Sequence, residues 1–415
     1  MDESLTKQFM VVNRINFWIV LCYCFSFFVS VQQMNAQMMA RISFDPAKNS
    51  IINTKNDKNW ARFATQVKRN KSINKSNLTI VHIGDSHIQG GYYTNRFREL
   101  LDQSYGIKER GFIFPYPLLK ANGSEDVKFF STSGWTGEKY NHSLSRQKAG
   151  ISGYNLHLKD STGMISISRA LGAGPYFSFH ELVVYHNDSF LQVSSESATR
   201  VVTNATNSQL FASHMFFATP IDSITIHFQN CHANTLFFGF DLKNSQPGIT
   251  YDAIGVNGAS FETFANDLDY ISELKVMVPD CIIISLGTND SYLRELDTLI
   301  LKHKIISMIE KIRKEFPASC IILTTPGDHL LHKKYFNDNL IKASATIISA
   351  ASDQHCAYWD FFNVMGGLGS SKKWAQNGLM YRDMLHLSKE GYKLQGDLFF
   401  EAFTKAIEES STINQ

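Results

Sequence analysis

The sequence predicts a doubly wound α/β sandwich that carries an inserted all-β domain, and three observations lead to this fold class. Short, continuous apolar runs alternate with segments of helical periodicity in two separate parts of the chain. Such runs are typical of parallel strands that helices cover on both faces. Between residues 115 and 250 the pattern changes to short alternating runs without helical periodicity. The 415 residues, 44% of them hydrophobic, suffice for two domains or for one domain with a large insertion.

Residues 1–36 are expected to be a secretory signal peptide. Lys7 and Arg14 precede a largely apolar stretch at 15–31, and a polar segment that ends near the small residue Ala36 follows it. An uncleaved membrane anchor is the alternative. No later stretch is long and apolar enough to span a bilayer, so we expect no stable membrane span after cleavage.

Residues 37–114 are expected to form the first part of the α/β domain. Trp60, Phe63 and Val67 have helical spacing, which predicts a helix at about 57–69. A strand at 78–84 and a helix at about 92–104 follow it. The strand is a continuous apolar run, which is typical of a parallel strand that helices cover on both faces.

Residues 115–250 are expected to form an inserted β-sandwich. The candidate strands are short, alternate in polarity and are separated by Asn, Ser and Gly; they lie at 164–168, 177–185, 190–194, 200–203, 223–228 and 235–242. Alternation of this kind is typical of antiparallel sheets that bury one face.

Residues 251–415 are expected to complete the α/β domain. Strands are predicted at 251–256, 279–286, 320–325 and 356–361, and helices at about 260–276, 295–316, 333–350 and 388–409. In a doubly wound fold, sites lie at the carboxyl ends of the parallel strands. The residues that directly follow these strands are therefore the first candidates for chemistry.

Charge and cysteine content exclude several functions. The formal net charge is only +2, without a long run of one sign, so nucleic acid is not an expected partner. Beyond residue 36 the cysteines are expected to be buried free thiols, with one disulfide as the alternative; they are Cys231, Cys281, Cys320 and Cys356. None has the spacing of a metal site, and we expect no metal and no cofactor.

Ser86 follows the strand at 78–84 within the sequence Gly-Asp-Ser-His. A serine hydroxyl becomes a useful nucleophile when a neighbouring base takes its proton. Between a strand end and a helix start, its hydroxyl would be exposed and its backbone N–H would point toward a developing oxyanion. Taken alone, the same pattern fits a serine that caps a helix in an ordinary loop.

Asp383 and His386 precede the helix expected at 388–409. At this spacing the carboxylate can hold Nδ1 of the imidazole, which leaves Nε2 free to act as a base. An exposed pair in a loop is the alternative. Together with Ser86, the pair supplies the parts for acyl transfer through a serine ester.

Asn289 and Gly258 are candidate donors to an oxyanion. The Asn289 amide follows the strand at 279–286, where its N–H can stabilise a developing negative charge. Gly258 follows the strand at 251–256, and a glycine lets the backbone approach a substrate closely. A helix cap is the alternative at Asn289, and an ordinary tight turn is equally plausible at Gly258.

These residues resemble the SGNH hydrolase family, also called the GDSL-type esterases. Four blocks match in order, namely Gly84-Asp85-Ser86, Gly258 within Gly255-Val-Asn-Gly-Ala, Gly287-Thr-Asn289-Asp290 and Asp383-x-x-His386. The resemblance covers about 75–105 and 251–400 and implies a three-layer sandwich with a parallel sheet. It also implies the nucleophile Ser86, the base His386, the orienting carboxylate Asp383, and oxyanion donors from the Ser86 and Gly258 backbones and the Asn289 side chain.

Two departures from the common family pattern point to one branch. His87 stands where leucine is usual, and 172 positions separate Ser86 from Gly258, far more than in plain members. Both features resemble secreted bacterial peptidoglycan O-acetylesterases, which carry a β-sandwich like a carbohydrate-binding module at this point. The resemblance implies a secreted or periplasmic serine esterase that removes O-acetyl groups from a cell-wall glycan, with peptidoglycan as the preferred substrate.

The sequence leaves other functions open. Within the esterases, the substrate can be another acetylated polysaccharide, a lipid or a thioester, and the acetyl group can pass to a glycan hydroxyl in place of water. A protein of another class, a non-catalytic glycan-binding or structural protein, would use the β insert alone. The intact set of Ser86, Asp383, His386 and Asn289 argues against that class.

Further residues near these blocks are candidates for a role in the site or in the local structure. His87 is a candidate pocket residue or a local hydrogen-bonding group, and His329 is a rival base. Asp85 and Asp290 are expected to bond the loop backbone. Four aromatic residues can stack on a sugar ring or pack in the core; they are Trp135, Tyr140, Trp374 and Tyr381.

Overall fold

The computed structural model describes residues 46–55, 57–72, 75–139, 150–206, 209–265 and 268–410. The segment 1–36, expected to be a signal peptide, lies outside the described residues. None of the helices within the described ranges combines the length and the apolar character needed to cross a membrane.

The central sheet of the α/β domain has seven strands in the order β1-β20-β17-β16-β2-β15-β3. All neighbours run parallel except β1, which is antiparallel to β20. The strands are β1 (Ile51–Ile52), β2 (Leu78–Gly84), β3 (Ile107–Glu109), β15 (Ile249–Gly255), β16 (Cys281–Ser285), β17 (Cys320–Thr324) and β20 (Ala357–Trp359).

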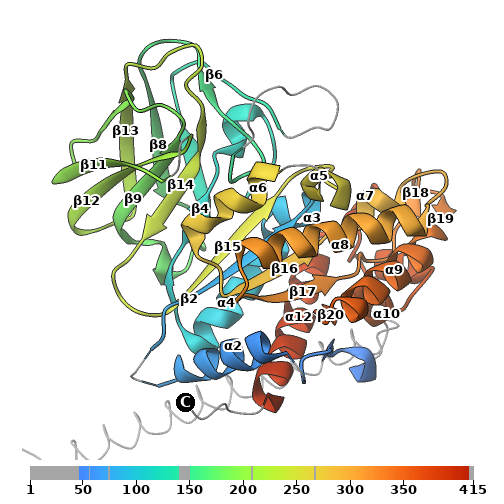
Figure 1. Ribbon diagram of the computed structural model, residues 1–415. Coiled ribbons are helices and arrows are strands. Elements are labelled where there is room, and N and C mark those ends of the chain that lie inside the picture. The colour runs from blue at the N-terminus through green and yellow to red at the C-terminus, as the bar shows by residue number, and fades with distance from the viewer. Residues whose placement is uncertain are drawn as a thin grey trace, which may run out of the picture.

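Helices cover both faces of this sheet (Figure 1). On one face lie α2 (Lys58–Arg69), α4 (Tyr92–Tyr105) and α12 (Lys389–Glu409). On the other face lie α5 (Phe261–Ala265), α6 (Leu268–Glu273), α8 (Thr298–Glu315) and α9 (Asn339–Asp353). Strand β16 shows why its sequence is continuously apolar: Ile283 packs into one core, while Ile282 and Ile284 pack into the other.

Shorter helices and a hairpin follow the strands of the central sheet. They are α3 (Ser86–Gln89), α7 (Thr288–Ser291), α10 (Phe361–Met365), α11 (Ser370–Gln376), and the pair β18 (Leu330–Leu331) and β19 (Tyr335–Phe336). The pair β6 (Trp135–Thr136) and β7 (His157–Leu158) lies within the insert. Of the candidate aromatic wall, Trp374 is fully buried, Tyr381 is exposed, and Tyr140 lies outside the described residues.

Two antiparallel sheets form the β insert, at the upper left of Figure 1. One has the order β10-β13-β8-β5 and the other β11-β12-β9-β14-β4. The strands are β4 (Gly111–Ile113), β5 (Val127–Phe130), β8 (Gly163–Arg169), β9 (Phe179–His186), β10 (Gln192–Ser194), β11 (Arg200–Ala205), β12 (Phe211–Ile221), β13 (Ser223–Gln229) and β14 (Phe237–Lys243). The α/β fold with an added all-β unit is therefore confirmed.

The chain passes between the two units twice, side by side. It leaves the central sheet between β3 and β4, and it returns between β14 and β15. Strand β4 already pairs with β14 of the antiparallel sheet. The boundaries expected from the sequence, at 114/115 and 250/251, stay predictions.

Two predicted helices differ from the structure. The helix expected at 333–350 begins only at Asn339, because the hairpin of β18 and β19 occupies 330–336. The helix expected at 260–276 is divided into α5, α6 and a 3₁₀ turn at Leu274–Met277. The cysteines at 231, 281, 320 and 356 are buried free thiols.

Candidate active site

Ser86 is the first residue of α3, directly after β2. Asp85 caps this helix, and its carboxylate accepts a hydrogen bond of 2.9 Å from the His87 N–H. The helix packs so tightly on the strand ends that a Cβ on Gly255 would lie 2.1 Å from the Gln89 backbone nitrogen. Glycine is therefore required there, and the close packing fixes Ser86 at the carboxyl edge of the sheet.

His386 and Asp383 meet Ser86 although 300 residues separate the serine from the histidine. Ser86 Oγ lies 2.8 Å from His386 Nε2, and His386 Nδ1 lies 2.7 Å from Asp383 Oδ2. With Nδ1–H donating to the carboxylate, Nε2 is the nitrogen that can accept the serine proton. The structure thus brings the three predicted residues into one hydrogen-bonded chain, Ser86–His386–Asp383, which we call the relay.

The turn that carries this relay is locked by backbone hydrogen bonds. Asp383 Oδ1 accepts from the N–H groups of Leu385 and His386, both at 2.9 Å. Met384 has a φ of 59°, a left-handed conformation that costs energy outside glycine. Its carbonyl accepts from the Leu330 N–H at 2.9 Å, which ties the turn to strand β18.

The same hydrogen bonds set the charge of Asp383. Partial burial acts to raise its pKa, but the His386 N–H, the His386 imidazole and the Leu385 N–H outweigh burial and hold the pKa below its ordinary value. The carboxylate therefore stays ionised, as a group that orients and stabilises an imidazolium must.

Asn289 lies in α7, after β16, beside the Gly258 turn. Its Nδ2 donates to the Ala259 carbonyl at 2.8 Å and lies 3.5 Å from Asp85 Oδ2. Gly258 has a φ of 81°, and the Ala259 N–H closes the turn on the Val256 carbonyl. The two predicted donors are thus brought to one place, next to the cap of the helix that begins at Ser86.

Asp85 and Asp290 are buried and bond backbone N–H groups. Asp290 accepts from the Phe261 N–H at 3.2 Å, which joins α7 to α5. Burial raises the pKa of Asp85 to about 6 and that of Asp290 to about 7.

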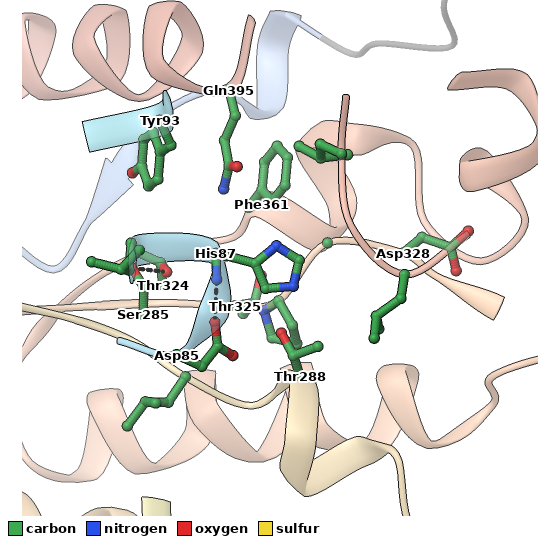
Figure 2. A pocket seen from close by; sticks show the side chains of 16 residues that line it. Asp85, His87, Tyr93, Ser285, Thr288, Thr324, Thr325, Asp328, Phe361 and Gln395 are labelled. Carbon is green, nitrogen blue, oxygen red and sulfur yellow. Dashed lines mark hydrogen bonds between the residues drawn. The ribbon is translucent and has the colours of Figure 1, made fainter. Parts of the chain in front are cut away.

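His87 lines a small cavity of about 30 Å³ together with Ser285 and Thr324 at the carboxyl ends of β16 and β17 (Figure 2). Its ring centroid lies 5.0 Å from that of His386, and its Nδ1 lies 2.8 Å from the Tyr392 hydroxyl. Its Nε2 is buried and has no hydrogen-bond partner among the described residues. A space of this size accommodates a water molecule. Burial, and secondarily the neighbouring His386, lower the pKa of His87 well below its ordinary value.

His329, the rival base, is held elsewhere. Its Nδ1 lies 3.2 Å from the Gly327 carbonyl and its Nε2 lies 3.0 Å from Asn337 Nδ2. Burial lowers its pKa to about 4. Both ring nitrogens of His329 have partners within the segment that follows β17, so neither nitrogen is the base that contacts Ser86.

Two residues of the site carried no signal in the sequence. Gln89 Oε1 accepts from the Asn257 N–H at 2.8 Å and from the Tyr154 hydroxyl at 2.9 Å, so it joins the serine helix to the Gly258 turn and to the insert. Tyr392 holds His87. A single glutamine or tyrosine in a helix gives no pattern from which such a partner could be read.

The α/β domain has the fold of the SGNH hydrolases. Residues 222–394 match the GDSL-like lipase/acylhydrolase family, a stretch that includes Gly258, Asn289, Asp383 and His386. Ser86 lies upstream of the matched stretch, because the insert separates the first block from the others. The matched stretch begins within the insert and covers most of the second part of the α/β domain.

Three solved structures are similar to the chain over different shares of its length. A peptidoglycan O-acetylesterase is 20% identical, with a TM-score of 0.72, over 86% of this chain and 99% of its own. A lipase/acylhydrolase from Enterococcus faecalis is 18% identical, with a TM-score of 0.32, over 40% of this chain and 80% of its own. A GDSL-like lipase from Bacteroides thetaiotaomicron is 19% identical, with a TM-score of 0.31, over 39% of this chain and 77% of its own. A search of curated proteins gave no match.

Proposed function

We propose that this protein removes O-acetyl groups from a cell-envelope glycan, with peptidoglycan as its substrate, through an acyl-enzyme on Ser86. The observation that carries the proposal is the hydrogen-bonded relay of Ser86, His386 and Asp383 at the carboxyl edge of the sheet. The likeness to a peptidoglycan O-acetylesterase supports the substrate, because it extends over 86% of the chain and so includes the insert.

In the proposed reaction, His386 Nε2 takes the proton of the Ser86 hydroxyl while the oxygen attacks the acetyl carbonyl. The backbone N–H groups of Ser86 and Gly258 and the amide of Asn289 stabilise the tetrahedral oxyanion. The sugar hydroxyl leaves with the proton from His386. Water, deprotonated by the same imidazole, then attacks the acetyl ester and releases acetate and free Ser86.

The place of action follows from the substrate. A glycan of the cell envelope lies outside the cytoplasm, and residues 1–36 have the sequence pattern of a secretory signal. We therefore propose that the mature protein acts in the periplasm or at the cell surface, without a stable membrane span and without a metal or cofactor.

The deciding experiment compares the chain lacking residues 1–36 with its Ser86→Ala variant. Acetate release from O-acetylated peptidoglycan is measured for both, with thermal unfolding to show that the variant is folded. We expect release by the parent and none above background by the variant. If the parent cleaves an aryl acetate or acetylated xylan but releases no acetate from peptidoglycan, that result would support the esterase activity and would contradict peptidoglycan as the substrate.

A further inference from the structure

The hairpin of β18 and β19 projects beside the candidate active site, at the right edge of Figure 1. It belongs to the loop after β17, and that loop emerges at the same carboxyl edge of the sheet as Ser86. The Leu330 N–H of β18 donates to the Met384 carbonyl, in the turn between Asp383 and His386. The hairpin is therefore attached to the turn that holds the relay.

The tip of the hairpin adopts a conformation that its residues do not favour. His332 has a φ of 50° and Lys333 a φ of 65°, and the Lys334 N–H closes the turn on the Leu331 carbonyl at 3.0 Å. Turns whose two central residues both have positive φ values strongly prefer Asn and Gly. The strained turn is held by a hydrogen bond of 3.0 Å from the His332 N–H to the Tyr292 hydroxyl.

The result of this geometry is a set of exposed aromatic rings and cations. Tyr335 is 57% exposed and Phe336 is 46% exposed. Lys334 Nζ lies 5.3 Å from the Tyr335 ring centroid, and Lys372 Nζ of α11 lies 4.1 Å from that of Phe336. We call Lys333, Lys334, Tyr335, Phe336 and Lys372 the hairpin surface.

Three lysines, Lys333, Lys334 and Lys372, give the hairpin surface its positive charge. Among the ion pairs of the described residues, none involves Lys333, Lys334 or Lys372. The carboxylates that flank the segment 329–337 are the buried Asp328 and the exposed Asp338, so the three lysines outnumber the one exposed carboxylate next to the hairpin. Local excess of one sign in a balanced protein is suited to binding a partner of the opposite sign.

We propose that the hairpin surface binds the carboxylates of the peptides that peptidoglycan carries beside its acetylated sugars, while its aromatic rings pack on the adjoining sugar or peptide. Lysine recognises a carboxylate as a point charge, and exposed aromatic rings offer an apolar face at low entropic cost. The surface would distinguish acidic peptidoglycan from neutral acetylated polysaccharides. The proposal rests on the proposed function for its substrate, but its test is a binding measurement that needs no hydrolysis.

The test uses the chain lacking residues 1–36 and soluble, non-acetylated peptidoglycan fragments, either unmodified or with their carboxylates converted to amides. The double variant Lys334→Glu/Lys372→Glu is compared with Lys314→Glu, an exposed lysine near the carboxyl end of α8, at the opposite edge of the sheet. Dissociation constants are measured by calorimetry. Cleavage of a neutral aryl acetate is measured alongside, to show that the relay is intact.

We expect the parent to bind the unmodified fragment about 5- to 20-fold more tightly than the amide, and the double variant to lose this preference. Raising the salt concentration to about 0.5 M should also reduce the parent's preference for the unmodified fragment, because exposed charges are screened. Lys314→Glu should behave as the parent, and all three should cleave the aryl acetate equally.

Equal binding of both fragments by the parent, or an unchanged preference in the double variant, would overturn the proposal. The parent could prefer the unmodified fragment and yet release no acetate from O-acetylated peptidoglycan. This outcome would support binding by the hairpin surface and would overturn the proposed function instead.

Discussion

At the scale of single residues, the unusual feature of this site is a second histidine directly after Ser86, the proposed nucleophile. His87 lies against the His386 ring and bonds the Tyr392 hydroxyl, yet burial keeps it neutral. A neutral ring beside His386 adds packing without adding a positive charge that would oppose formation of the imidazolium. We therefore assign His87 a positioning role.

Replacing His87 by leucine should lower kcat while leaving KM within about twofold. The leucine leaves the Tyr392 hydroxyl buried without its partner and removes the ring that packs on His386. A reduction of about tenfold in kcat corresponds to about 1.4 kcal/mol. Steady-state kinetics with an aryl acetate measures it, and His87→Asn, which keeps an acceptor for the tyrosine, should recover part of the loss. Unchanged kcat in both variants would refute the role.

Asn289→Ala should lower kcat by about 10²- to 10³-fold under the proposed mechanism, because one oxyanion donor is lost. KM should change little, since the donor acts mainly in the transition state. The amide also bonds the Ala259 carbonyl, so thermal unfolding must be measured alongside to separate catalysis from stability. A loss of activity that merely follows a loss of folded protein would contradict the assignment.

At the scale of elements, strands were predicted better than the loops between them. The runs at 78–84 and 320–325 match β2 and β17, because a strand buried on both faces must be apolar throughout. The sequence therefore sufficed to predict that the residues after these strands lie together at the carboxyl edge of the sheet. The hairpin of β18 and β19 was missed because its turn, at His332 and Lys333, contains no Gly, Asn or Pro to indicate it.

The contact between α7 and α5 should make stability depend on pH through Asp290. Burial raises its folded pKa to about 7, above that of an unfolded aspartate, so its contribution is fully present below about pH 4 and is lost as the pH rises through 7. Asp290→Asn removes the titration. The free energy of unfolding of the variant should therefore rise relative to the parent between pH 4 and pH 8, by up to about 4 kcal/mol. Urea unfolding across this range measures it, and a constant difference would contradict the prediction.

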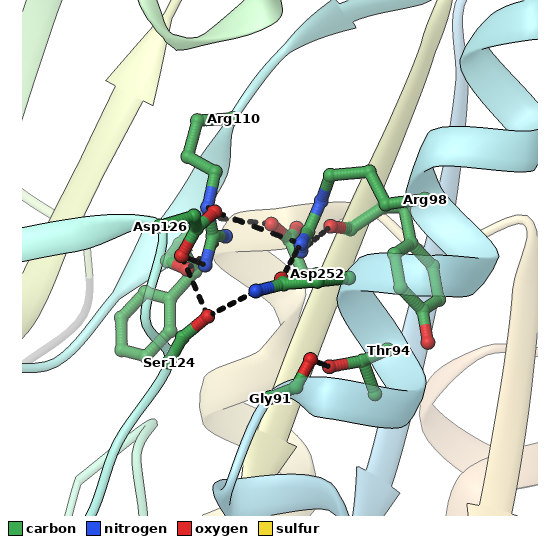
Figure 3. Close-up of polar contacts among 10 residues, drawn as sticks. Gly91, Thr94, Arg98, Arg110, Ser124, Asp126 and Asp252 are labelled. Atoms are coloured by element: carbon green, nitrogen blue, oxygen red, sulfur yellow. Dashed lines mark hydrogen bonds and ion pairs between the residues drawn. The ribbon is translucent and has the colours of Figure 1, made fainter. Parts of the chain in front are cut away.

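At the scale of the whole molecule, a buried charged cluster joins the insert to the α/β domain (Figure 3). Arg110 lies where the chain crosses from β3 to β4, and its Nε and Nη2 donate to the two carboxylate oxygens of Asp126, which precedes β5. Arg98 of α4 lies 3.9 Å from the same carboxylate and donates to the Tyr251 carbonyl of β15 at 2.9 Å. The cluster therefore links α4, the central sheet and the insert.

The sequence could not predict this cluster. Its charged members lie at positions 98, 110 and 126, with spacings that match neither a helix nor a strand. Each residue alone is an ordinary surface residue by type, and its burial becomes visible only when the two crossings of the chain are placed side by side. The insert as a unit could be predicted, but the contacts that hold it could not.

Asp126→Asn should therefore destabilise the protein by about 3–5 kcal/mol at pH 7, because it leaves two buried guanidinium groups without their carboxylate. The exposed pair of Arg169 and Asp222, 3.4 Å apart, provides the control, and Asp222→Asn should cost less than about 1 kcal/mol.

The pH dependence of the Asp126 effect follows from its pKa. Burial alone would raise that pKa, but Arg110 and Arg98 outweigh burial and lower it to about 2. The unfolded aspartate titrates near 4, so the contribution of Asp126 is present above that pH and is lost as the pH falls toward 2. Urea unfolding of parent and variant should show a difference that is constant from pH 7 to about 5 and shrinks below 4. If the difference in the free energy of unfolding persists unchanged at pH 2.5, packing, and not the paired charges, accounts for the stabilisation by Asp126.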